Sequence, residues 1–455
     1  MALRDKPPGR GAYGYRELLV FFLPLAASSL IQGFRGPILD AGMSRGNFPI
    51  DSLAAFAVIS SVMMMPATSA NSLQSLFLVF VRGRGSYERV RRFTSWFGLA
   101  VIALTAVLAI PSVGDFIFLD VMGAPPEINA FLRPALLIML LFPMAMIARA
   151  FFQSILVLER STRPVWLAST TGMVALVAIS FGVTPFVSMR ASTVAALAQV
   201  AVAVVEAAVL WFVVRRTLGE NPLRPDPEDT QIPTTGRLLQ FLWPLLITQM
   251  LMAGTTPLVS AGILRLDDGE IALAGYRVAW SLAVIGFGAI VMLRQTTLVM
   301  SRDPADHRRG RIFSVAAGAM VTALLFLASL GPAGDFVLNT LIGSPPEVSA
   351  VALPAWRILA FLPLLGSLRQ FYTSLLLSRG KSRSASVGSL IRVAAVAVSL
   401  FYLAPGIAMA GATLGALARV GGGVIETVVS TAIGHRYYGR FSQSGKPDRR
   451  SEEQE

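Results

Sequence analysis

The sequence predicts an all-α polytopic membrane protein whose twelve transmembrane helices form two six-helix lobes. Its composition is 54% hydrophobic and 14% charged, and its mean hydropathy is +0.64. Apolar runs alternate with short polar loops, and each run is long enough for the roughly 20 apolar residues that a bilayer-crossing helix needs. The chain also repeats itself at an offset of 220 residues, so the helices fall into two equivalent sets.

The apolar runs define the expected spans in chain order. They cover residues 17–43, 52–81, 93–120, 129–158, 164–187, 192–214, 238–264, 271–301, 312–341, 348–378, 385–406 and 408–435. Between the sixth and seventh runs, the segment NPLRPDPEDTQIPTTG is polar and rich in proline, as linkers are. The expected domains are therefore an N-terminal tail (1–16), a first lobe (17–214), a linker (215–237), a second lobe (238–435) and a C-terminal tail (436–455).

Basic residues are unevenly shared between alternate loops. The tails, the linker and the loops 82–92, 159–163, 302–311 and 379–383 together hold 27 lysines and arginines. The intervening loops hold only Arg45, Arg190 and Arg265. Because cytoplasmic loops carry the excess of positive charge, we expect both termini in the cytoplasm and the chain in the inner (plasma) membrane. These loops also account for most of the net charge of +13, so nucleic acid is not an expected partner.

The internal repeat is visible residue by residue. Pro24, Pro37 and Glu206 align with Pro244, Pro257 and Glu426, and the loop GAPPE at 123–127 aligns with GSPPE at 343–347. Six spans is an even number, so both repeats enter the membrane in the same orientation and are related by an axis along its normal. This arrangement is typical of proteins that move a solute between the two faces; a duplicated scaffold without a cavity is the alternative.

Arginines lie inside the predicted spans, although an arginine at the centre of a span costs at least ~2.5 kcal/mol. They are Arg35, Arg133, Arg149, Arg277, Arg294, Arg357, Arg369, Arg392 and Arg419. Such groups normally face the protein interior or a water-filled path. For Arg133 and Arg277 near the outer ends, and for Arg294 and Arg392 near the cytoplasmic ends, snorkelling to the interface is an alternative.

Four of the buried charges form a repeated set. Arg149 and Glu206 lie at similar distances from the cytoplasmic ends of the fourth and sixth spans, and Arg369 and Glu426 repeat this relation in the second lobe. Because a lone buried charge is far more costly than a paired one, we expect Arg149–Glu206 and Arg369–Glu426 to be structural ion pairs.

The remaining arginines are distributed asymmetrically. Arg294, Arg357 and Arg419 align with uncharged Gln74, Leu137 and Gln199, and Arg35 aligns with Thr255. Unpaired arginines along a central path attract anions, and their planar forks match carboxylate and phosphate groups. We therefore expect Arg35, Arg294, Arg357, Arg392 and Arg419 to bind substrate. For Arg357, a bond to backbone carbonyls freed near Pro363 is the alternative.

Asp40 is the candidate for proton coupling. It is an acid of the first span without a proposed partner, and Ser260 occupies the equivalent position of the second repeat. Pairing with Arg35, or a position at the outer surface, is the alternative.

Other classes of site are weakly indicated or excluded. There are no cysteines, which removes disulfides, thiolate catalysis and cysteine-ligated metals. The two histidines, His307 and His435, form no metal cluster, and no phosphate-binding loop or nucleophile–base set is present. We therefore expect no enzyme activity, no metal and no cofactor, and a protein that works as a monomer in the lipid bilayer with a small anion as its partner.

Several short strings resemble the progressive ankylosis (ANK) protein family, related to the MATE and lipid-flippase (MOP) superfamily. They are PLAASSLIQGF at 24–34, LFLVFV at 76–81, LPAWRILAFLP and SLRQ within 353–370, SLIRVAAVAVSL at 389–400 and GATLGALARVGGGVIET at 411–427. The chain is similar to a bacterial-type member. The resemblance assigns family arginines to Arg294, Arg357, Arg369 and Arg392 and a family glutamate to Glu426, whereas Arg35 and Arg419 depart from the pattern of the animal members.

The resemblance implies a two-lobed transporter that works by alternating access on a citrate-, nucleotide- or pyrophosphate-like anion. Two other transport functions stay open. A flippase for an anionic lipid-linked precursor would also use arginines but needs an apolar groove that opens to the bilayer. A MATE-like, cation-coupled multidrug exporter would need acids exposed to its cavity. A receptor or scaffold is disfavoured, because it would not need so many buried charges.

Overall fold

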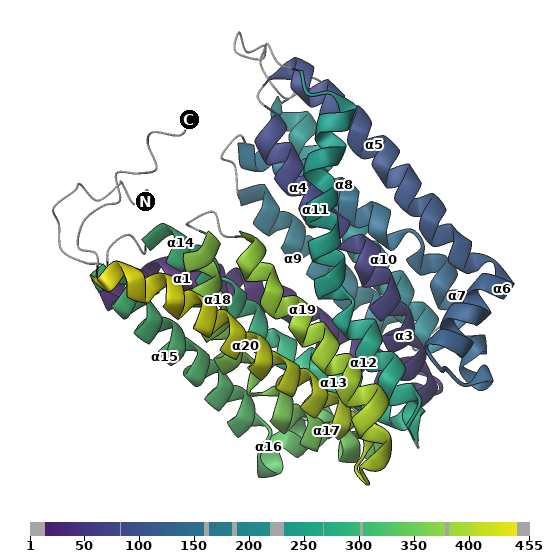
Figure 1. Cartoon of the computed structure of the whole chain (residues 1–455). Helices are drawn as coiled ribbons and strands as arrows, with labels where there is room; N and C mark the ends of the chain where they lie inside the picture. Colours follow the sequence, from purple (N-terminus) through teal and green to yellow (C-terminus); the bar gives the residue numbers. More distant parts are fainter. Residues whose placement is uncertain are drawn as a thin grey trace.

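The computed structural model describes residues 14–81, 83–158, 163–183, 189–218, 232–266, 268–300, 304–377 and 382–443, and every regular element within these ranges is helical (Figure 1). The first repeat contains α1 (Tyr15–Gly33), α2 (Arg35–Ser44), α3 (Pro49–Ala67), α4 (Ser69–Phe80), α5 (Arg84–Ala106), η1 (Val107–Ala109), α6 (Pro111–Asp115), η2 (Phe116–Val121), η3 (Pro126–Ile128), α7 (Asn129–Met139), α8 (Phe142–Leu158), α9 (Arg163–Val177), η4 (Ala178–Val183) and α10 (Ala191–Leu218).

The second repeat follows the same order. It contains α11 (Thr235–Ala253), α12 (Thr255–Leu264), α13 (Gly269–Val291), α14 (Leu293–Met300), α15 (Pro304–Ala328), α16 (Gly331–Asp335), η5 (Phe336–Ile342), α17 (Pro346–Leu359), α18 (Leu362–Leu377), α19 (Ser382–Val398), η6 (Ser399–Leu403), η7 (Ala404–Gly406) and α20 (Gly411–Gln443). The π-helical turns η2 and η5 are equivalent, as are η4 and η6, so the repeat extends to irregular backbone.

Prolines break four of the spans at equivalent points. Helices α1 and α11 end at Gly33 and Ala253, four residues before Pro37 and Pro257. Helices α7 and α17 end in the same way at Met139 and Leu359, four residues before Pro143 and Pro363. A proline lacks the backbone N–H that would bond the carbonyl four residues earlier, and its ring collides with that carbonyl. Each affected span is therefore two helical segments joined at a bend.

The predicted fold class is confirmed. Among the described residues, ten helical stretches are long and apolar enough to cross a membrane. The first expected span corresponds to α1 with α2, and the eleventh to the shorter apolar helix Val387–Leu403. The chain is thus an all-α, multi-pass membrane protein of the expected two-lobed type.

The two lobes of the folded protein differ from the two sequence repeats, because α1 and α11 have exchanged places between the lobes. Helix α1 packs against α13, α14 and α15, and its Phe22 and Ala26 share a core with Ile290 and Leu293. Helix α11 packs against α4, where Leu242 joins the core of the first lobe. In Figure 1, α11 lies among the blue helices of the first repeat and α1 among the green helices of the second. The expected boundaries 17–214 and 238–435 therefore delimit the sequence repeats. In space, α1 packs on the second lobe and α11 packs on the first.

The two lobes meet mainly through α2 and α3 of the first lobe and α12 and α13 of the second. One large apolar core spans this junction and includes Leu39 and Phe56 from the first repeat and Val259 and Trp356 from the second. This junction fixes the positions of α12 and α13, two of the helices that line the candidate site.

Candidate functional site

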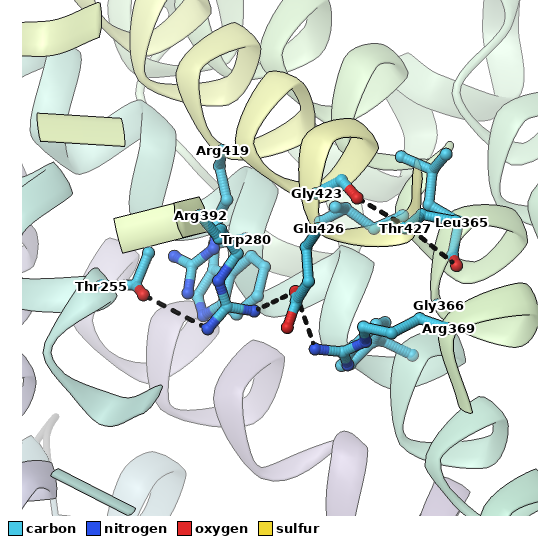
Figure 2. A pocket seen from close by; sticks show the side chains of 12 residues that line it. Thr255, Trp280, Leu365, Gly366, Arg369, Arg392, Arg419, Gly423, Glu426 and Thr427 are labelled. Atoms are coloured by element: carbon cyan, nitrogen blue, oxygen red, sulfur yellow. Dashed lines mark hydrogen bonds and ion pairs between the residues drawn. The ribbon is translucent and has the colours of Figure 1, made fainter. Parts of the chain in front are cut away.

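A cavity of about 220 Å³ lies inside the second lobe, between α12, α13, α18, α19 and α20 (Figure 2). We call it the second-lobe cavity. It is lined by Thr255, Trp280, Phe287, Leu362, Leu365, Gly366, Arg369, Arg392, Arg419, Gly423, Glu426 and Thr427. Three of these residues are arginines and one is a glutamate, so the charged groups of the lining sum to a net charge of +2.

Glu426 connects two of the arginines. Its Oε2 accepts hydrogen bonds from Nη1 of Arg369 and Nη1 of Arg392, each at 3.0 Å, as Figure 2 shows. Its Oε1 accepts a hydrogen bond of 2.7 Å from the hydroxyl of Ser389. Arg392 also donates through Nη2 to Thr255 at 3.4 Å. Glu426 is nearly fully buried, so two cations compensate the cost of desolvating its carboxylate.

Arg419 has only neutral partners among the described residues. Its guanidinium carbon lies 3.5 Å from the ring centroid of Trp280, a stacking geometry that a planar guanidinium favours. Nη1 donates to the hydroxyl of Tyr276 at 2.7 Å, and Nη2 donates to the hydroxyl of Thr256 at 3.1 Å. The positive charge of Arg419 is therefore positioned but not neutralised by an acid.

Glycines bring α20 against α19 at the cavity. A Cβ at Gly422 would lie 2.7 Å from Cγ2 of Val396, which is closer than real side chains approach, and 3.1 Å from Cγ of Arg392, which is a tight contact. Small residues such as those of GATLGALARVGGGV permit helices to approach closely. The structure shows close approach within one continuous helix, α20.

The first lobe contains a related cluster that is built differently. Glu206 forms ion pairs with Arg35 and, at 2.8 Å, with Nε of Arg149. Position 172, the equivalent of Arg392, is glycine, and a Cβ there would lie 2.8 Å from Cγ of Glu206. Each glutamate thus pairs with a second arginine from a different helix: Glu206 pairs with Arg35 of α2, and Glu426 pairs with Arg392 of α19. In the first lobe, the side chain of Glu206 occupies the space beside Gly172.

Both expected ion pairs are present in the structure, and a third contact accompanies them. Arg149–Glu206 and Arg369–Glu426 are in contact. Arg35 was expected to be unpaired, but it lies against Glu206, so this expectation is corrected. The sequence did not reveal this pair because Arg35 has no charged equivalent in the second repeat.

The other expected substrate residues separate into two groups. Arg392 and Arg419 line the second-lobe cavity, whereas Arg294 and Arg357 do not. Arg357 donates through Nε and Nη2 to the carbonyl of Ser329, at 3.3 and 3.2 Å. This carbonyl lies just after α15 and is not one of those freed near Pro363. Arg294 is an exposed residue of α14.

Asp40 has a partner, which corrects the expectation that it is unpaired. Its Oδ1 lies 2.8 Å from Nε of Arg277, and the side chain of Asp40 is completely buried. Arg277 also donates to the hydroxyl of Ser60 at 3.1 Å and lies over the ring of Phe56. Neither alternative for Asp40, a pair with Arg35 or a place at the surface, matches this geometry. Because Asp40 is on α2 and Arg277 on α13, the ion pair joins the two lobes.

Comparisons with known proteins agree with this architecture. The chain resembles an inward-facing multidrug resistance MATE family transporter of the MOP superfamily (TM-score 0.72, 13% identity, 94% of this chain and 99% of that chain covered). It also resembles the lipid II flippase MurJ in an inward closed conformation (TM-score 0.65, 12% identity, 94% of both chains). A third similar structure, from Pyrococcus furiosus, is a MOP superfamily transporter whose binding pocket is described as having reverse polarity (TM-score 0.62, 12% identity, 96% of this chain and 100% of that chain).

The family comparison concerns the second repeat. Residues 230–420 match the progressive ankylosis protein (ANKH) family. This range includes Arg369, Arg392 and Arg419 of the second-lobe cavity and ends six residues before Glu426. Residues 230–420 therefore resemble the progressive ankylosis protein family, on a fold that both repeats share with MATE and MOP superfamily transporters.

Proposed function

We propose that the chain is a membrane transporter for a small organic or phosphorylated anion, and that it works by alternating access of its two lobes. The observation that carries this proposal is the second-lobe cavity, where three arginines face one glutamate. Charged hydrogen bonds from guanidinium groups to carboxylate or phosphate oxygens are strong and geometrically specific. An excess of two positive charges in this cavity favours an anion and disfavours a cation.

The size of the cavity favours a compact anion. About 220 Å³ is below the roughly 300–1,000 Å³ of pockets that hold drug-sized ligands. A citrate-like or pyrophosphate-like anion fits this volume better than a whole nucleotide does. Arg294 and Arg357 stay candidates for contacts elsewhere along the path, outside the second-lobe cavity.

The alternative transport functions are less well supported. A flippase for a lipid-linked precursor is favoured by the likeness to MurJ, but the second-lobe cavity is small and its charged lining is unsuited to an acyl chain. A MATE-like exporter of cations needs a free acid, whereas Glu426 already contacts two arginines. Export or import of an anion remains the better match to the charges.

We infer the placement in the membrane from the distribution of basic residues. With 27 lysines and arginines on one side and three on the other, the positive-inside rule supports cytoplasmic termini in an inner (plasma) membrane. The likeness to an inward-facing transporter supports a state that is open toward that side.

The proposal is tested by a ligand screen on the purified full chain. Thermal unfolding in detergent is measured with citrate, pyrophosphate and ATP and, in parallel, with cationic dyes of the kind that multidrug exporters bind. We expect the small anions to raise the unfolding temperature, because a ligand that binds only the folded state stabilises it. Uptake of the best anion into proteoliposomes then measures transport. Stabilisation by the dyes alone, with no effect of any anion, would refute the proposal.

A further inference from the structure

The acid of the second-lobe cavity is fixed in place. Glu426 accepts one hydrogen bond each from Arg369, Arg392 and Ser389, at 3.0, 3.0 and 2.7 Å. Both carboxylate oxygens therefore have donors, which hold the carboxylate group at the wall of the cavity. Any anion that enters must share Arg369 and Arg392 with this carboxylate.

Donors remain available to a ligand beside Glu426. Nη2 of Arg392 makes only the long 3.4 Å contact with Thr255. Nε of Arg392 has no acceptor among the described residues, but protein atoms enclose it. Arg419 has neutral partners alone in the described structure. The arginines that line the cavity thus have more donor capacity than Glu426 uses.

The net charge of the cavity lining determines which ligand charge it compensates best. Three guanidinium groups and one carboxylate leave two positive charges to be compensated. Within a protein cavity, charge that is left uncompensated in either direction is costly, because it is screened less than in bulk water. Two negative charges on the ligand match the cavity, and a third would face Glu426 without a cation of its own.

The first lobe offers an internal comparison. Glu206 also lies between two arginines, Arg35 and Arg149, but Gln199 stands at the position of Arg419. Glu206 is completely buried and is not among the residues that line the second-lobe cavity. If Glu426 only held its arginines together, as Glu206 does, replacing either glutamate would have the same effect on ligand preference. If Glu426 also faces the ligand, the two replacements should differ.

We propose that Glu426 is a specificity-determining residue that limits the second-lobe cavity to anions with two negative charges. This inference rests on the proposed function and narrows its substrate class to dicarboxylates, singly protonated tricarboxylates and phosphorylated dianions. Glu426 acts as a built-in counter-charge, which keeps more highly charged anions from binding more tightly than dianions.

The test measures how affinity depends on ligand charge. Isothermal titration of the purified full chain at constant pH and ionic strength uses propionate, succinate and tricarballylate, which carry one, two and three carboxylates. For the parent protein, we expect affinity to rise from propionate to succinate and not to rise further for tricarballylate. In E426Q, which removes the negative charge and keeps the shape, we expect the affinity for tricarballylate relative to succinate to increase about tenfold. E206Q is the matched control and should keep the ratio of the parent.

A second pair of variants decides the question if E426Q does not fold. R392Q and R392Q/E426Q differ only at Glu426, and removing both partners of a buried ion pair is tolerated better than removing one. The double variant has two uncompensated arginines, as the parent has, so it should again prefer succinate, whereas R392Q alone should lose the advantage of succinate over propionate. Equal ratios in E426Q and the parent, or in R392Q and the double variant, would overturn the inference alone. A parent protein that binds none of the three anions would overturn the proposed function and the inference with it.

Discussion

Arg45 and Arg265 occupy equivalent positions of the two repeats, and each donates hydrogen bonds to an equivalent stretch of backbone in the other repeat. Arg45 donates to the carbonyls of Thr340, Leu341 and Ile342, at 2.7, 2.8 and 2.7 Å. Arg265 donates to the carbonyls of Asp120 and Val121, which align with Thr340 and Leu341. Two exchanged contacts of this kind hold the lobes together at one end of the molecule.

Glycines of positive φ complete both contacts. Gly343 and Gly123 have φ angles of +74° and +75°, values that residues with a Cβ rarely adopt. A Cβ at Gly343 would lie 3.2 Å from Cζ of Arg45, and one at Gly123 would lie 3.0 Å from Cγ of Arg265. Glycine therefore permits both the turn and the approach of the arginine. In the membrane orientation proposed from the basic loops, this end is the one away from the cytoplasm.

The first prediction is that the double variant R45Q/R265Q opens this end of the molecule. Each arginine bridges the lobes through several hydrogen bonds, so removing both shifts the equilibrium toward a state in which the lobes separate there. Spin labels on I110C and L330C, exposed and equivalent positions in the two repeats, report the distance between lobes. The chain has no native cysteine, so labelling is specific. We expect the distance distribution to move to longer values.

The control for this experiment is R190Q. Arg190 donates to the carbonyl of Ala130 and lies over the ring of Phe131, both within its own repeat. Its loss removes a surface arginine without removing a bridge between lobes. A distribution that moves equally in R190Q and R45Q/R265Q would contradict the assignment of Arg45 and Arg265 as the bridging residues.

The second prediction concerns the buried pair of Asp40 and Arg277. Replacing Arg277 with glutamine leaves the carboxylate of Asp40 buried without a cation, at a cost of about 3–5 kcal/mol. The double variant D40N/R277Q removes both charges and should unfold at a temperature closer to that of the parent. Thermal unfolding in detergent measures the difference, and a double variant that is less stable than R277Q would show that the pairing is not what stabilises the parent.

The third prediction tests whether Asp40 couples transport to protons. Protonation of Asp40 would break its ion pair with Arg277, which joins α2 to α13. If this step drives the cycle, D40N should show transport whose rate no longer changes with pH, whereas the rate of the parent should change. Proteoliposome uptake at a series of pH values measures this, and an unchanged pH profile in D40N would remove the coupling role.

The sequence was informative where the repeat constrained both partners. The offset of 220 residues predicts the pairs Arg149–Glu206 and Arg369–Glu426, and it also predicts equivalent bends, because each proline acts on the carbonyl four residues before it. It could not predict Arg35–Glu206, since this contact joins spans one and six and has no charged equivalent in the second repeat. Contacts of this kind depend on which faces the helices present to one another, and tertiary packing alone decides that.

The fourth prediction is that Arg419 cannot be replaced by lysine. Arg419 stacks on Trp280 at 3.5 Å and places two of its nitrogens on Tyr276 and Thr256. A lysine has neither the planar face nor the forked donors that this arrangement uses. We expect R419K and R419Q to weaken binding of citrate by a similar factor, roughly 10–100-fold for a lost charge-assisted hydrogen bond. Isothermal titration measures this, and parent-like affinity in R419K would place the ligand away from Arg419.

The fifth prediction compares two glycines of the same span. A Cβ at Gly172 would lie 2.8 Å from Cγ and 2.9 Å from Oε1 of Glu206, whereas a Cβ at Gly182 would meet nothing within 4 Å. G172A therefore forces the glutamate away from Arg35 and Arg149, and overpacking of this kind costs about 1–3 kcal/mol. G182A should leave the unfolding temperature close to that of the parent, because it adds a methyl group in open space. If G172A is as stable as G182A, Glu206 can move without losing its arginines, and the first-lobe cluster is more adaptable than its packing indicates.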